Sequence, residues 1–336
     1  MEEASVEAIA SAAGAIRGSI ERVIVGKGPV VELALVAVMC EGHLLLEDVP
    51  GIGKTMLARS VARSLGFSFR RIQCTPDLMP SDITGTYVYN QKNGDFEFRP
   101  GPVFAQLVLA DEINRATPRT QSALLEAMEE RQVTLEGDTK PLPRPFLVLA
   151  TQNPIELEGT FPLPEAQLDR FLMRVRMGYP TEADDLIILE RFAQRNPIEE
   201  LTPVISAEQV QRLQQACRRV RVELDVQGYI IQLVHATRKH PQVELGASPR
   251  AMLALFRTAQ ALAAIRGRRY VIPDDVKYLT PFVLEHRIIP KAQSSLRGLA
   301  TADVLRAVLD SVPAPVEAQP SPRLGPGASA KPGGQG

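Results

Sequence analysis

The stretch Glu47–Leu57, EDVPGIGKTML, most constrains what this chain can fold into. It follows the apolar run His43–Leu46 and opens a helix-like segment, so it predicts a strand, a tight turn and a helix in direct succession. Gly51 and Gly53 allow the turn to curl until successive backbone N–H groups and the positive end of the helix face one point. Such a point suits a phosphate group, and the alternative is a chance glycine-rich turn.

The residues beside these glycines predict a nucleoside triphosphate with Mg²⁺. Lys54 would reach the β- and γ-phosphates as a point charge, while the Thr55 hydroxyl would hold the metal. The usual eight-residue phosphate-loop (P-loop) pattern is missed only at its first position, where Asp48 replaces glycine. The part that faces the phosphates is complete, so we expect the nucleotide to contact Pro50, Gly51, Ile52, Gly53, Lys54, Thr55 and Met56.

The composition shows no charge signature of nucleic-acid or membrane binding. The 336 residues carry a formal net charge of −1, so any such contact would need a local patch. The most apolar segment, Pro29–Cys40, contains Glu32 and is too short to span a bilayer. The 3 cysteines lack metal-ligand spacing and indicate thiols in a reducing compartment, and the acidic first residues argue against a secretory signal. The cytoplasm is therefore the expected location.

The order of the predicted elements indicates two folded domains and a tail. Residues 1–180 alternate helices with apolar strands, as in an α/β domain. Pro180–Thr181 marks a boundary, and residues 181–312 have only helical patterns. Residues 313–336 are rich in Pro, Gly, Ala and Ser, which predicts a disordered tail.

Two hairpins are predicted inside the first domain. Thr75–Pro102 contains two alternating runs around Asn93–Gly94, a dipeptide that favours a two-residue type I′ turn. Gln132–Pro143 has the pattern of a second hairpin. A minimal βαβ unit needs neither insertion, so each is a functional protrusion or a surface elaboration.

Polar side chains follow two fully apolar strands. Asp111 and Glu112 come directly after Gln106–Ala110, and Asn153 follows Pro145–Ala150. The carboxyl ends of parallel strands share one sheet edge, which is where ligands bind in open α/β sheets. Asp111 would hold Mg²⁺, Glu112 would polarise the attacking water and Asn153 would orient that water. The alternatives are an acidic cap of the next helix and a plain Asn-Pro turn.

The chain resembles the MoxR-type ATPases of the AAA+ superfamily in motifs that occur in the same order: PGIGKT, LVLADEINRA, LLEAMEERQVT, FLVLATQNPIELEGTFPLPEAQLDRF and GASPRA. The resemblance implies an α/β fold in which a doubly wound αβα P-loop domain precedes a small all-helical lid. It also implies a homo-hexameric ring with ATP and Mg²⁺ between subunits.

The resemblance further implies roles for residues outside the loop. Arg170 in LDRF matches the arginine finger offered to a neighbour's ATP, and Arg250 in SPRA matches the second sensor of the lid. Ser248–Pro249 starts a helix, and we expect its first turn to face the nucleotide across the interdomain crevice, so that Arg250 couples the lid to the γ-phosphate. Asn153 matches the first sensor, and Val25 and Gly26 match the segment that lines the adenine. Both hairpins match insertions that face the substrate or the pore. Without that context, either arginine is an ordinary surface residue in an ion pair or on a solvated helix face.

The expected function is therefore ATP hydrolysis by a chaperone-like ring that remodels protein partners, among them proteins with a von Willebrand factor A domain. A nucleic-acid motor is one alternative, but QVTLEGDTKPLP in the second hairpin is nearly neutral and lacks aromatic residues. A regulatory scaffold with little turnover is the other, and the presence of Glu112 and Arg170 argues against it.

Overall fold

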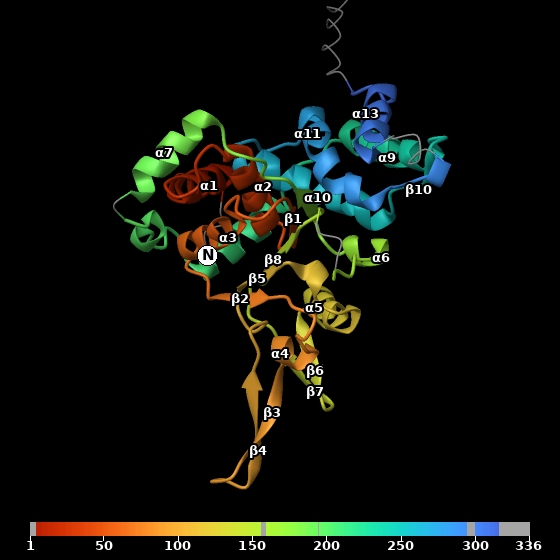
Figure 1. The fold of residues 1–336 in the computed structure, drawn as a ribbon. Coiled ribbons are helices and arrows are strands. Elements are labelled where there is room, and N and C mark those ends of the chain that lie inside the picture. Colours follow the sequence, from red (N-terminus) through yellow and green to blue (C-terminus); the bar gives the residue numbers. More distant parts are fainter. Residues whose placement is uncertain (1–4, 156–158, 194, 294–299, 316–336) are drawn as a thin grey trace, which may run out of the picture.

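The computed structural model describes residues 5–155, 159–193, 195–293 and 300–315, so most of the predicted disordered tail, from 316 onward, lies outside the described residues. Its centre is a five-stranded parallel sheet in the order β2-β5-β8-β1-β9. Figure 1 shows helices on both sides of this sheet. The strands are β1 (Leu44–Glu47), β2 (Phe69–Gln73), β5 (Leu107–Asp111), β8 (Leu147–Gln152) and β9 (Met173–Val175).

Alternate residues of the central strands enter two apolar cores, one on each face of the sheet. Leu44 and Leu46 of β1 pack into the core that contains the N-terminal helices. Leu45, between them, packs into the opposite core with Val108 and Val148. All residues of β1 and β5 are buried, which explains why these strands lack an alternating polar pattern.

The first core continues from the sheet into the C-terminal helices. α1 (Val6–Glu21) and α2 (Gly28–Met39) lie between the sheet domain and the C-terminal helices, and they bury apolar residues against both. The sheet is also covered by α3 (Lys54–Ser64) and α5 (Pro118–Glu130), with the short η1 (Ile113–Arg115) and α6 (Glu165–Leu168) at its edge. Because the core is continuous, the boundary between 1–180 and 181–312 remains a prediction.

The C-terminal part is helical, as predicted, apart from the short antiparallel pair of β10 (Val243–Leu245) and β11 (Ile289–Pro290). Its helices are α7 (Glu182–Phe192), η2 (Pro197–Glu200), α8 (Ala207–Cys217), α9 (Leu224–Lys239), α10 (Pro249–Ile265), α11 (Pro273–Leu284), η3 (Glu285–Arg287) and α13 (Thr301–Ser311). This order confirms the predicted doubly wound α/β domain followed by a helical part. Among the described residues, none of the helices combines the length and apolarity that a bilayer span requires.

Both predicted hairpins form, but the first has a different turn. β3 (Gly85–Asn90) pairs with β4 (Asp95–Pro100) after the short α4 (Pro80–Thr84), and Figure 1 shows this hairpin projecting away from α11 and α13. Asn90 pairs with Asp95, so the loop holds four residues, and only Gly94 of the loop has a positive φ. The expected type I′ turn is therefore wrong, because it needs two central residues with positive φ. The second hairpin joins β6 (Gln132–Leu135) to β7 (Asp138–Pro141).

His43 anchors the start of β1 as a neutral buried base. Its Nδ1 accepts a hydrogen bond from the Val148 N–H at 3.0 Å, so its Nε2–H donates to the Met128 carbonyl, also at 3.0 Å. The side chain is 6% exposed and packs edge-on against Phe146. Burial lowers the pKa of His43 from 6.5 to about 4, and the nearby charge of Arg131 acts in the same direction.

Acid should therefore destabilise the fold through His43. Between pH 6.5 and about 4, the unfolded histidine binds a proton and the folded one does not, so stability falls as pH falls, by up to about 1.4 kcal/mol per pH unit from this group. We expect His43→Asn, which retains an acceptor for the Val148 N–H, to flatten the dependence of melting temperature on pH. Equal slopes for the variant and the unaltered chain over this window would contradict the assignment.

Candidate nucleotide-binding site

The predicted loop between β1 and α3 has the geometry of a phosphate cradle. Gly51 and Gly53 have φ values of +85° and +92°, which are left-handed conformations that favour glycine. α3 begins at Lys54 directly after Gly53, so its unpaired N–H groups point to the loop. Lys54 is 9% exposed, and its ammonium donates to the Asp48 carbonyl at 2.5 Å. Burial lowers its pKa, against the pull of the carboxylates Asp48, Asp111 and Glu112.

Two adjoining cavities meet over this loop and share Pro50, Gly51, Gly53 and Met56. The first, of about 510 Å³, is mainly apolar and is lined by Val23, Ile24, Val25, Lys27, Ile52, Met177, Tyr179, Pro180, Asp185, Ile188 and Phe192 together with the shared residues. The second, of about 350 Å³, contains Lys54, Thr55, Arg71, Asp111, Glu112, Thr151 and Asn153. An apolar cavity beside a charged one fits a base and ribose beside a polyphosphate.

The two predicted acids lie at the charged end of the cleft, and Thr151 fixes them both. The Thr151 hydroxyl donates to Asp111 Oδ1 at 2.6 Å and accepts the Glu112 N–H at 2.8 Å. Glu112 has a left-handed backbone with φ of +57°, a strained conformation that occurs often at functional sites. Its carboxylate accepts hydrogen bonds from Arg115 and from Gln73, at 3.1 and 3.2 Å.

The oxygen ligands at this end fit a magnesium ion. The Thr55 hydroxyl and the Asp111 carboxylate line the same cavity, and Mg²⁺ prefers oxygen ligands that are completed by phosphate and water. Arg71 of β2 donates to Asp111 Oδ2 at 2.6 Å, so a cation already faces this carboxylate. Thr55 and Asp111 thus present oxygen atoms to one cavity, in positions that suit a divalent metal.

Asp48, the departure from the loop pattern, ties the loop to the segment after β9. Its Oδ1 accepts the Val49 N–H at 2.9 Å, and its Oδ2 accepts the Gly178 N–H at 2.6 Å. A glycine at this position would make neither bond. Asp48 therefore stabilises the loop from outside the cleft and leaves the part that faces the phosphates unchanged.

The two residues predicted to lie beside the adenine differ in their placement. Val25 lines the apolar cavity. Gly26 is not among its lining residues; it has a φ of +68°, and a Cβ atom here would come within 2.3 Å of the Asp184 carboxylate on α7. Gly26 therefore allows close approach of α7, the helix that supplies Asp185, Ile188 and Phe192 to the cavity wall.

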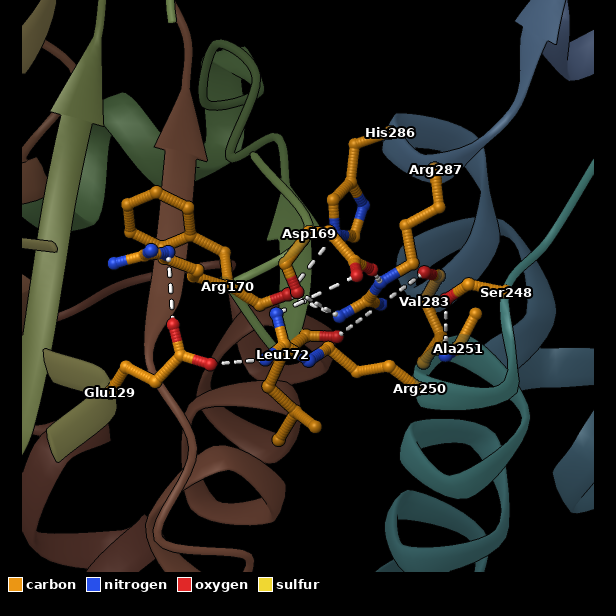
Figure 2. A network of polar contacts seen from close by, with 11 residues as sticks. Glu129, Asp169, Arg170, Leu172, Ser248, Arg250, Ala251, Val283, His286 and Arg287 are labelled. Carbon is orange, nitrogen blue, oxygen red and sulfur yellow. Dashed lines mark hydrogen bonds and ion pairs between the residues drawn. The ribbon is translucent and has the colours of Figure 1, made fainter. Parts of the chain in front are cut away.

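Arg170 and Arg250 lie together, outside the residues that line either cavity. Both contact Glu129 near the end of α5: Arg170 Nε lies 3.1 Å from Oε2, and Arg250 forms an ion pair with Oε1. Figure 2 shows the two guanidinium groups on either side of this carboxylate. The N-terminal turn of α10, capped by Ser248, therefore directs Arg250 to the surface that carries Arg170 and not to the cleft of its own chain.

Several contributors to the cleft were not predicted from the sequence, among them Thr151, Arg71 and α7. Thr151 could have been found, because it follows a buried strand and precedes Asn153, so it must lie at the same sheet edge. Arg71 lies in the mixed strand FRRIQ, where nothing in the sequence indicates its pairing with Asp111 across the sheet. α7 was not predicted, because none of its residues is buried and its apolar pattern is weak.

We expect Thr151→Val to impair nucleotide turnover more than nucleotide binding. The variant leaves the Glu112 N–H and one Asp111 oxygen without their partner, and a hydrogen bond to a charged group is worth about 1.5–3 kcal/mol. Turnover should therefore fall by roughly 10- to 100-fold in a phosphate-release assay. Thr151→Ser retains the hydroxyl and is the control. Equal turnover in the valine and serine variants would exclude the positioning role of Thr151.

Comparison with known proteins agrees with this geometry. Residues 43–173 match the ATPase family associated with various cellular activities (AAA), and residues 235–307 match the AAA lid domain. The first match spans β1 to the start of β9, and the second includes α10, α11 and η3.

Similar proteins extend over nearly the whole chain. The uncharacterized protein YeaC of Bacillus subtilis is 51% identical over 89% of this chain and 93% of its own length. Chaperone MoxR1 of Mycobacterium tuberculosis is 44% identical, over 88% of this chain and 80% of its own. The crystal structure of a protein from Cytophaga hutchinsonii, described as a putative ATPase, superposes with a TM-score of 0.87 at 38% identity and covers 93% of this chain and 97% of that one. The chain therefore belongs to the MoxR-type ATPases of the AAA+ superfamily.

Proposed function

We propose that this chain is an ATP hydrolase that works in the cytoplasm as a ring of identical subunits, a hexamer, and remodels protein partners. The observation that carries the proposal is the convergence of a buried P-loop lysine, two carboxylates and a polar sensor on one cleft. The name of the relative Chaperone MoxR1 supports a chaperone-like output. ATP hydrolysis is the general activity of the family to which the chain belongs.

The cleft residues divide the chemistry between binding and activation. Lys54 and the N–H groups of the loop would bind the β- and γ-phosphates, and Thr55 with Asp111 would hold Mg²⁺. When bound, the metal would neutralise charge that develops on the phosphates. Glu112 would polarise the attacking water after exchanging its contact with Arg115, and Asn153 would orient that water.

A ring accounts for the position of the two arginines. Arg170 and Arg250 lie away from the cleft of their own chain and gather on one surface around Glu129. The ion pair of Arg170 with Glu129 is partly exposed, at 30% and 34%, so its exchange for a phosphate costs little. We propose that both side chains act on ATP bound by the neighbouring subunit, Arg170 as the finger and Arg250 as the sensor of the lid.

The projecting hairpins favour a protein client over a nucleic acid. Tyr89 and Phe96 on the β3–β4 hairpin are 52% and 68% exposed, and Asp95 and Glu97 lie beside them. Tyr87 donates to Asp138 at 2.7 Å and joins this hairpin to β6–β7. An exposed apolar pair suits a polypeptide. The hairpin also has no excess of positive charge with which to bind a phosphate backbone, because Lys92 and Arg99 are balanced by Asp95 and Glu97. The clients to test first are proteins with a von Willebrand factor A domain.

Glu112→Gln should separate binding from hydrolysis. The amide retains the size of the side chain but cannot accept a proton, so ATP should stay bound while turnover falls by about 10²–10⁴-fold. Nucleotide binding and phosphate release measured on the same preparation will check this. The control is Glu126→Gln on the exposed surface of α5, which should leave both unchanged. Normal turnover by Glu112→Gln would remove Glu112 from the role of water activator.

Mixing two inactive variants should restore activity if the site is shared. Lys54→Ala lacks the lysine that binds the phosphates but retains the arginine finger. Arg170→Ala retains the lysine but lacks the finger. A finger is worth about 10³–10⁵ in rate in other P-loop enzymes, so each variant alone should be nearly inactive. Phosphate release by the mixture should exceed the sum of the separate variants once sedimentation shows mixed assembly. Mixed assemblies without any gain would count against the shared site.

A further inference from the structure

The short helix η3 of the lid holds the turn that carries Arg170. Arg287 Nε donates to Asp169 Oδ1 at 2.7 Å, and its Nη2 donates to the Asp169 and Phe171 carbonyls at 3.1 and 2.5 Å. Its Nη1 donates to the Leu172 carbonyl at 3.0 Å and to the Val283 carbonyl of α11 at 2.5 Å. Figure 2 shows this guanidinium between the turn and the lid helices. Arg287 thus contacts residues on both sides of Arg170.

The contact is specific to a planar group with several donors. The Arg287 side chain is 3% exposed, and a buried cation of this kind is costly unless all its donors are satisfied. Here the acceptors are the Asp169 carboxylate and four backbone carbonyls, those of Asp169, Phe171, Leu172 and Val283. His286 adds a contact from its Nε2 to the Phe171 carbonyl at 3.1 Å. A lysine at this position would retain the positive charge, but its single ammonium group could not make all the hydrogen bonds of the planar guanidinium.

The same short helix is also linked, through arginines on or next to β9, to β1, the strand that leads into the P-loop. The Glu285 carboxylate pairs with Arg174 at 3.0 Å and with Arg176 at 3.5 Å, both on or next to β9. These arginines also pair with Glu47, the last residue of β1, at 3.5 and 3.0 Å. η3 is therefore linked to the end of β1 through Arg174 and Arg176, and it directly contacts the turn that carries the finger.

We propose that Arg287 is a positioning residue that sets the orientation of Arg170 and thereby links the lid of one subunit to hydrolysis in the next. The inference rests on the proposed function, in which Arg170 acts on a neighbour's ATP. Asp169, the residue before the finger, receives Arg287 on one oxygen and lies 3.7 Å from Arg250 on the other. The lid therefore contacts the finger turn from η3 and from α10, and a shift of the lid must move that turn.

The test is Arg287→Lys in the full chain, with Arg268→Lys as the matched control. Arg268 is another lid arginine; it pairs with the fully buried Asp275 at 2.5 Å but makes none of the contacts to the finger turn described above. Arg287→Lys should bind ATP with unchanged affinity and hydrolyse it about 10²-fold more slowly, the usual effect of a misplacement near 1 Å. Arg268→Lys should hydrolyse ATP at the normal rate. Equal turnover in both lysine variants would overturn the proposal.

Mixed assemblies identify the step at which Arg287 acts. A subunit with a misplaced finger has an intact cleft, so Arg287→Lys should regain activity when mixed with Lys54→Ala and gain none when mixed with Arg170→Ala. In the double variant Arg287→Lys with Arg170→Ala, turnover should equal that of Arg170→Ala alone. Recovery in the mixture of Arg287→Lys with Arg170→Ala would show that Arg287 serves its own cleft and would overturn the inference.

A second variant covers the case in which Arg287→Lys does not fold. Asp169→Asn retains the shape of the side chain and removes the charge that Arg287 and Arg250 share, so it should show the same mixing behaviour as predicted for Arg287→Lys. If it recovers with Arg170→Ala, the inference fails. If Lys54→Ala and Arg170→Ala do not recover with each other, the shared site itself fails, and this outcome is distinct from failure of Arg287 alone.

Discussion

The position of β8 between β1 and β5 is the constraint on which the site depends. Parallel pairing in this order brings the P-loop, which follows β1, and the acids, which lie at the end of β5, to one sheet edge, with Thr151 between them. One hydroxyl then orients both Asp111 and the Glu112 backbone. The strained left-handed conformation of Glu112 persists because β5, which ends just before it, is fully buried and pairs with β8, which is buried except at its last residue.

The arginines around the finger differ in how firmly they are held. The ion pairs of Arg170 and Arg250 with Glu129 are partly exposed and contribute little to stability, so these side chains are free to exchange partners. Arg287 is buried and satisfied by backbone carbonyls, and its removal would leave several acceptors unpaired. Burial lowers the pKa of Arg287, and the Asp169 carboxylate opposes that effect. The molecule thus combines one fixed, buried arginine with two partly exposed arginines that can exchange partners.

The lid is not an independent globule attached by a linker. α1 and α2 bury apolar residues against the sheet on one side and against α8 and α10 on the other, in one continuous core. The lid is therefore connected to the nucleotide domain by apolar packing as well as by the polar contacts of η3. Because packed interfaces tolerate small sliding motions better than separation, this arrangement favours small shifts of the lid over its detachment.

The sequence by itself determined the local features: strands that are apolar throughout, the glycine turn before Lys54, and acids directly after a buried strand. These features depend on residues that are close together in the chain, and the periodicity and spacing of such residues are compatible with few local structures. Only the tertiary structure decided the partners of Arg71, Thr151 and Asp48, the shared position of Arg170 and Arg250, and the contacts of Arg287. Each of these joins segments distant in sequence, and nothing in a local pattern specifies which distant group a polar side chain meets. The type I′ turn predicted at Asn93–Gly94 was wrong because a local preference was overridden. The pairing of the flanking strands, which joins Asn90 to Asp95, sets a four-residue loop instead.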